Sequence, residues 1–194
     1  MDKIRSAYEM AMERFKQRKE VPRGEIDRME HIPIGKAIAA KYLREKDYDI
    51  FSEANKYSEN MRGYILEGAQ ETILSNILLP LDKATYETNK KAMEGILQIK
   101  KNKQAASEIL GQIEHLFRYY ESSVEQAYSR FKDMYTAKLS SSLQSLGKRV
   151  GAKIKIDPEK QPGFREEWLK AIGSLTAQYE QLLGEQKGKL RNIK

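Results

Sequence analysis

The most constraining feature of this sequence is the proline-free stretch between Pro80 and Pro158, in which apolar side chains recur every three or four residues. Residues at this spacing lie on one side of an α-helix, so their stripe leaves water only when another helix packs along it. The chain must therefore fold around helices that pack side by side. The stripe consists of Ala92, Ile96, Ile99, Lys103, Ala106, Leu110, Ile113, Phe117, Tyr120, Val124, Ala127, Phe131 and Met134.

One segment inside this stretch, Lys100 to Gln104, decides whether the stripe belongs to one helix or to two. Ile96 and Ile99 stay in phase with the apolar residues after the segment, and all of its residues except Asn102 are good helix formers. The pattern favours one unbroken helix from Lys83 to Leu146, about 95 Å long. A tight turn at this segment is the alternative.

Shorter helices are predicted before Pro80. An apolar 4-3-4 spacing of Ile4, Tyr8, Ala11 and Phe15 predicts a first helix over residues 3–19. A short helical turn is expected over residues 25–31, and Pro33 predicts a break before a second helix that ends near residue 46. Apolar residues at every fourth position predict a third helix over residues 50–78.

Asp82 is expected to cap the helix that follows Pro80, because an aspartate side chain can accept a hydrogen bond from a first-turn amide. Near the other end of the chain, Pro162 suits the first turn of a last helix, whose apolar stripe includes Trp168. The alternating residues 153–156 resemble a very short strand, but no second candidate strand accompanies them.

These elements predict an all-α fold: an elongated helical bundle with a long central, coiled-coil-like helix and a C-terminal helix that folds back on it. The expected organisation is one structural unit with N-terminal helices (1–80), a central helical segment (81–147), a linker (148–163) and a C-terminal helix (164–194).

Composition narrows the class of protein. The 194 residues are 40% hydrophobic and 32% charged, which is typical of amphipathic helices and too apolar for simple disorder. The absence of cysteine excludes disulfides and thiolate chemistry. No apolar stretch is long enough for a signal peptide or a membrane span, so we expect no membrane insertion and a cytoplasmic location.

The net charge of +7 is concentrated where helices are expected to end. Residues 81–103 hold six bases against three acids, and residues 148–163 hold five against two. Bases near helix C-termini commonly complement the helix dipole, but they can also bind anions. The candidate anion-binding residues are Lys100, Lys101, Lys103, Lys148, Arg149, Lys153 and Lys155.

Residues that could carry catalysis are scarce. His31 and His115 are the only imidazoles, and neither has a glutamate three residues before it, as a helical di-iron site requires. No phosphate-binding loop or nucleophile elbow is present. We therefore expect no enzymatic activity, no bound metal and no cofactor.

Aromatic and basic residues alternate in the second half of the central segment, a composition that also occurs in single-strand nucleic-acid platforms. Tyr120 and Phe131, however, belong to the apolar stripe itself, so burial between helices is the favoured interpretation. The same interpretation applies to Trp168.

The opening segment Ile4-Arg5-Ser6-Ala7-Tyr8-Glu9-Met10-Ala11-Met12-Glu13-Arg14 resembles the start of a group of uncharacterised bacterial helical proteins of similar length. The segments Gly35-Lys36-Ala37-Ile38-Ala39 and Leu78-Leu79-Pro80 are similar to that group as well. The resemblance implies an all-helical bacterial protein, and it transfers no activity, ligand or site residue.

The sequence alone does not assign a specific biochemical function. It favours a structural or adaptor protein that acts through helix-helix contacts and self-associates, most simply as a dimer, with a protein partner of unknown identity. The alternative is a basic helical protein that binds nucleic acid or the ribosome. The candidate interface residues are Leu110, Ile113, Phe117, Tyr120, Val124 and Phe131.

Overall fold

The chain folds as an all-α bundle, and the computed structural model describes residues 8, 10, 12, 22–147 and 157–193. The described residues contain no strand. Their elements are α2 (Arg23–Arg44), α3 (Ile50–Ala54), α4 (Glu59–Ser75), α5 (Lys83–Ile99), α6 (Lys103–Gly147), the 3-10 helix η1 (Pro158–Lys160) and α7 (Phe164–Asn192). The predicted first helix lies outside the described residues, apart from helical Tyr8, Met10 and Met12, and so does the strand-like segment 153–156.

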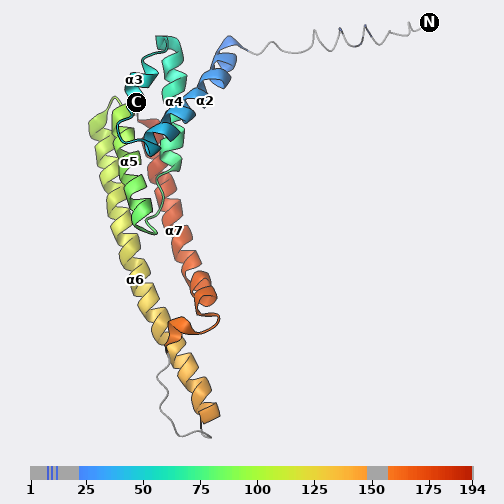
Figure 1. The fold of residues 1–194 in the computed structure, drawn as a ribbon, viewed down its shortest axis with the longest axis vertical. Helices are drawn as coiled ribbons and strands as arrows, with labels where there is room; N and C mark the ends of the chain where they lie inside the picture. The colour runs from blue at the N-terminus through green and yellow to red at the C-terminus, as the bar shows by residue number, and fades with distance from the viewer. Residues whose placement is uncertain (1–7, 9, 11, 13–21, 148–156, 194) are drawn as a thin grey trace, which may run out of the picture.

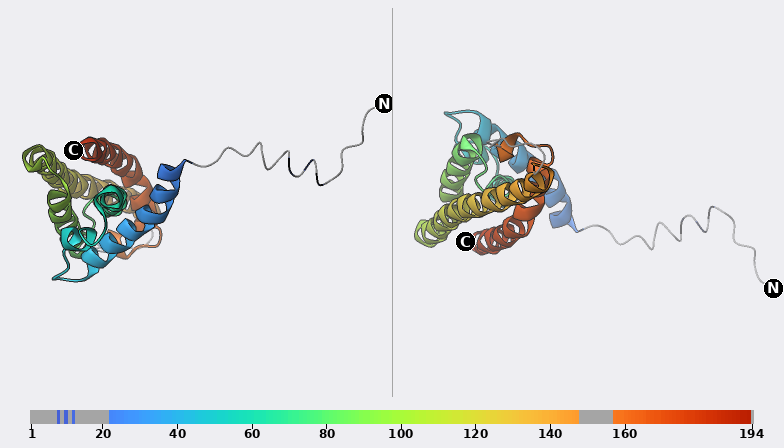
Figure 2. Two further views of the ribbon diagram at one scale, coloured as in Figure 1. Left: turned by 90° about the horizontal axis from the view of Figure 1, so that it is seen from above. Right: turned by 90° about the horizontal axis from the view of Figure 1, so that it is seen from below.

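The molecule has two parts, which we call the body and the arm (Figure 1). In the body, α2 to α5 pack beside the first part of α6 and the last part of α7. The arm consists of α6 from Val124 onward and of α7 residues 164–175, which continue beyond the start of α5. The views along the long axis also show α7 beside α6 (Figure 2), so the predicted return of the C-terminal helix is confirmed.

Helix α2 corrects the predicted break at Pro33, because the helix continues through this residue. A proline inside a helix costs a hydrogen bond and about 3 kcal/mol. Close packing of α2 on α4 offsets this cost: a Cβ atom at Gly35 would lie 1.9 Å from the Ile65 carbonyl oxygen, and one at Gly68 would lie 2.2 Å from that of Ile32. Gly35 therefore lies where α2 and α4 cross in close contact.

The predicted third helix is wrong in its continuity, since α3 ends at Ala54 and α4 begins at Glu59. Asp49 caps α3 by accepting a hydrogen bond from the Ser52 amide at 2.8 Å. The apolar spacing stays regular across the break because α3 and α4 both face the body core, in which Ala54 and Ile65 are fully buried.

The prediction of an unbroken central helix is also wrong: α5 ends at Ile99 and α6 begins at Lys103, so the two helices form a hairpin (Figure 1). Lys100 has extended backbone angles, and the Asn102 side chain accepts a hydrogen bond from the Ala105 amide at 3.0 Å. The stripe stays in phase because both helices turn it toward the same core. The predicted cap at Asp82 is confirmed, with a 2.7 Å hydrogen bond from the Thr85 amide.

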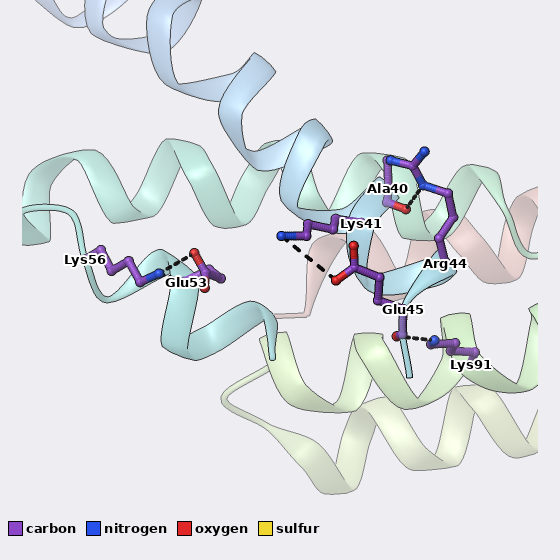
Figure 3. A network of polar contacts seen from close by, with 7 residues as sticks. All are labelled: Ala40, Lys41, Arg44, Glu45, Glu53, Lys56 and Lys91. Atoms are coloured by element: carbon purple, nitrogen blue, oxygen red, sulfur yellow. Dashed lines mark hydrogen bonds and ion pairs between the residues drawn. The ribbon is translucent and has the colours of Figure 1, made fainter. Parts of the chain in front are cut away.

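Polar contacts attach the C-terminal end of α2 to α5. The Lys91 ammonium donates a 2.6 Å hydrogen bond to the Glu45 carbonyl oxygen (Figure 3), and the Tyr42 hydroxyl donates one of 3.1 Å to the Lys91 carbonyl oxygen. Two core clusters result from this arrangement. The larger fills the body, and the smaller, in the arm, is built on Phe131, Tyr135 and Phe164.

Candidate helix-docking groove

The six residues that the sequence indicates as an interface line the inner side of α6. Five of them are buried within a single chain, at 0–8% exposure, and only Val124 is half-buried. A heptad-like stripe predicts that another helix covers it, but it does not distinguish the chain's own helices from those of a second copy. In this fold α5 and α7 supply the cover, so a second copy would have to contact mainly other residues.

An open groove lies beside this stripe, on the side of α5 and α6 where Val124 is found. A cavity of about 280 Å³ between α5 and α6 shares Tyr86, Glu87 and Glu121 with a wider one of about 760 Å³, which opens where α5 begins. Because they share these residues, the two cavities adjoin, and we call them together the groove. It runs along the α5–α6 hairpin and onto the first turns of the arm.

The open end of the groove is apolar. Leu81 is 76% exposed and Tyr86 is 55% exposed, and the half-buried side chains of Val124 and Tyr128 face them from α6. Exposed apolar residues that cluster at a groove, unlike single ones, commonly mark interaction sites. The arrangement can therefore receive an apolar side chain or a helix edge.

The connector between α4 and α5 positions this apolar end. Ile77 and Leu79 point into the body core, so Leu78 between them is turned outward. The buried Asn89 side chain donates a 2.7 Å hydrogen bond to the Leu78 carbonyl oxygen and accepts one of 2.8 Å from its amide. The backbone that leads to Leu81 is thereby fixed against α5.

Sequence reasoning did not identify Leu81, Tyr86 or Asn89. One signal was present: Leu81 and Tyr86 flank the Asp82 cap at the two positions that form a hydrophobic staple in many helices. The staple pattern predicts a local contact at a helix start, whereas it does not predict that both residues also line a groove. Asn89 carried no signal, since a helical asparagine is usually exposed.

The rim of the open end is acidic. Asp82, Glu87, Glu121 and Glu125 line it against a single base, Lys83, which gives a local charge of −3 in a chain of net charge +7. A hydrogen bond from the Thr85 amide, supported by the Thr85 hydroxyl, lowers the pKa of Asp82, which keeps this carboxylate ionised. The groove thus combines an apolar floor with a negative rim.

Packing along the arm is incomplete. Phe164 and Leu183 of α7 are buried, but the apolar side chains between them on the same face are only half-buried: Trp168, Ile172, Leu175 and Tyr179. α6 runs beside this part of α7 (Figure 1), and the 3-10 helix η1 adjoins its start. At the tip the aromatic side chains pack against one another, with the Phe131 and Phe164 ring centroids 5.1 Å apart. The predicted burial of Tyr120 and Phe131 is confirmed.

The structure describes three of the predicted anion-binding residues, Lys100, Lys101 and Lys103, and all three line one cavity of about 620 Å³. The Lys100 ammonium donates hydrogen bonds to the carbonyl oxygens of Arg191, at 3.2 Å, and Ile193, and burial lowers its pKa. Lys101 and Lys103 are exposed, and Arg62 lines the same cavity. The remaining four candidates, Lys148, Arg149, Lys153 and Lys155, lie outside the described residues.

Each of the two histidines contacts a residue of its own helix. His31 Nδ1 lies 2.8 Å from the Asp27 carbonyl oxygen, and His115 Nδ1 lies 3.1 Å from an Arg118 guanidinium nitrogen. Among the described residues, no three histidine, aspartate or glutamate side chains come together as a metal site would require. Among the helices of the described residues, none is long and apolar enough to cross a membrane.

Fold and groove together define an all-α bundle with an exposed, acid-rimmed apolar groove. The chain belongs to a family of unknown function, DUF6657, whose model matches residues 51–192. The family agrees with the expected resemblance to uncharacterised proteins, although the opening segment lies before the matched residues. The whole groove lies within them. No curated protein and no solved structure matches the chain.

Proposed function

We propose that this protein is a structural or adaptor protein that acts through helix-helix packing and associates with a second copy of itself. The observation that carries the proposal is the groove at the start of α5, where Leu81 and Tyr86 are exposed beside the half-covered part of α6. A helix bound in this groove would extend beyond the start of α5 and cover the adjoining part of α6.

Burial of the exposed apolar side chains supplies the driving force for such packing. Fully burying a large apolar side chain contributes roughly 1.5–3 kcal/mol relative to leaving it exposed. Leu81 and Tyr86 would be the anchors, and the half-buried Val124 would complete the contact. Closed dimers with two-fold symmetry are the commonest soluble assemblies, so a dimer is the simplest product.

Sedimentation over a range of protein concentrations tests this proposal. We expect a concentration-dependent dimer that Tyr86→Glu weakens by about tenfold or more, equivalent to 1.4 kcal/mol. Tyr119→Glu is the matched control, because Tyr119 is 68% exposed on α6 and does not line the groove. A protein that sediments as a monomer at every concentration contradicts self-association.

The alternative function, binding of nucleic acid, is favoured by a different cavity. Lys101 and Lys103 line it together with Arg62, whose Nε atom is buried without a hydrogen-bond partner. Asp49 and Glu59 line the same cavity and reduce its positive potential. Retention on heparin that Lys101→Glu and Lys103→Glu together abolish would support this alternative, and elution unaffected by the double change would refute it.

A further inference from the structure

We propose that the groove is occupied by the N-terminal segment of a second copy of this chain, residues 4–19, packed as an amphipathic helix. This inference rests on the proposed function, since it names the part of the partner molecule that enters the groove. Three independent features of the chain lead to it: exposed apolar residues, matching charge and limited reach.

The first feature is apolar surface that its own chain leaves uncovered. The 4-3-4 spacing of Ile4, Tyr8, Ala11 and Phe15 predicts an apolar helix face. Within the segment, the helical Tyr8 is 73% exposed, and the neighbouring Met10 and Met12 are 46% and 40% exposed. A helix that presents such residues needs a partner surface, and the groove at Leu81 and Tyr86 offers an apolar floor.

The second feature is charge. Residues 14–19 hold four bases, Arg14, Lys16, Arg18 and Lys19, and no acid. The open end of the groove carries a local charge of −3. Complementary potentials steer two surfaces together and fix which way round they dock. The basic end of the segment is therefore expected to lie over the acidic rim.

The third feature is reach, and it favours a second copy over the same chain. Six residues lie between Phe15 and Pro22, and the seven steps from one Cα atom to the next extend over at most about 25 Å. α2 has 22 residues and is about 33 Å long. It begins at the top of the molecule in Figure 1, and its far end contacts α5 at Lys91, next to the groove residue Lys90. Mutual exchange of the segment between two copies satisfies two-fold symmetry.

Cross-linking tests the inference directly, because the native chain contains no cysteine. A full-length Tyr8→Cys protein is mixed with an affinity-tagged Leu81→Cys protein and treated with a bismaleimide linker. We expect a covalent heterodimer that contains both chains. The control replaces the second protein with tagged Leu182→Cys, because Leu182 is 45% exposed on α7 and does not line the groove. Heterodimer yield no higher than in this control overturns the inference.

A second measurement compares the dimer dissociation constants of two variants of the segment. Phe15→Glu, on the apolar face of the segment, is expected to raise the dimer dissociation constant about tenfold or more. Ser6→Glu places the same charge on the opposite face of the predicted helix and should have a much smaller effect. A dimer that responds equally to both changes, or to neither, overturns the inference.

These results separate the two proposals. A wild-type dimer that gives no specific heterodimer overturns the segment as occupant and leaves self-association standing. A wild-type monomer overturns both. A chain carrying Tyr8→Cys and Leu81→Cys together that cross-links only within itself, while the mixture gives no heterodimer, shows that the segment binds its own groove, which also overturns the exchange between copies.

Discussion

Asn89 pairs with both backbone groups of Leu78: its side-chain nitrogen donates to the carbonyl oxygen at 2.7 Å, and its side-chain oxygen accepts from the amide at 2.8 Å. Asn89 is 1% exposed, so its side chain makes these bonds from inside the fold. One buried amide thus holds the connector that carries Leu81 to the edge of the groove.

Asn89→Ala is expected to lower the free energy of unfolding by roughly 2–4 kcal/mol, because it removes both hydrogen bonds to the Leu78 backbone and leaves a small cavity in place of a buried side chain. Urea denaturation measures the change. Asn60→Ala is the control, since Asn60 is exposed on α4 and should change stability by less than about 0.5 kcal/mol. Equal effects of the two changes would show that the Leu78 pairing contributes nothing.

Gly35→Ala is expected to destabilise the fold by about 1–3 kcal/mol or more, because the new methyl group would lie 1.9 Å from the Ile65 carbonyl oxygen unless α2 and α4 separate. Gly184→Ala, in α7, adds the same methyl group where no atom lies within 4 Å. It should stabilise the protein by about 0.4–1 kcal/mol, through higher helix propensity and a more restricted unfolded chain. Thermal unfolding of the two variants should therefore shift in opposite directions.

Lys100→Met removes the donor that binds the Arg191 and Ile193 carbonyl oxygens at the end of α7. Loss of these bonds should destabilise the protein by about 1–3 kcal/mol, even though methionine preserves much of the apolar stem. Amide hydrogen exchange should be faster in the last turns of α7. Lys101→Met, at an exposed neighbouring position, should leave both measurements nearly unchanged.

Lys132→Met is expected to raise the pKa of Glu159. In the native chain this pKa lies below the ordinary glutamate value of 4.5, mainly because Lys132 donates a hydrogen bond to Glu159 and also because Tyr128 donates one. A lowered carboxyl pKa stabilises the folded state above about pH 4.5, and that contribution is lost as the pH falls through the folded-state value. NMR titration of the Glu159 carboxyl group should show the shift. Lys138→Met should not alter it, because Lys138 pairs with Glu167 instead.

Much of the fold could be predicted from periodicity and capping. The return of α7 along α6 and the cap at Asp82 depend on local patterns, and the structure shows both. The break at Lys100 was missed because the stripe keeps its phase when a helix folds back on itself. Pro33 was misread because a favourable contact between α2 and α4 outweighed a local penalty.

The groove could not be predicted in the same way. Most of the apolar stripe on α6 is buried, but the stripe also included Lys103 and Met134, which are exposed. Periodicity does not reveal which stretch of a stripe the chain leaves uncovered. That depends on where α5 begins relative to α6, which is set by the Asn89 contact and by the hairpin at Lys100. Leu81 lies outside any helix, so no periodic pattern includes it.

The uninterrupted course of α6 has a mechanical consequence. Its 45 residues run from the hairpin to the tip of the arm without a proline, so they form a strut about 67 Å long. The length of this helix sets the distance between the tip of the arm and the body. Inserting four residues into the outer part of α6 would lengthen that spacing by about 6 Å and leave the body untouched.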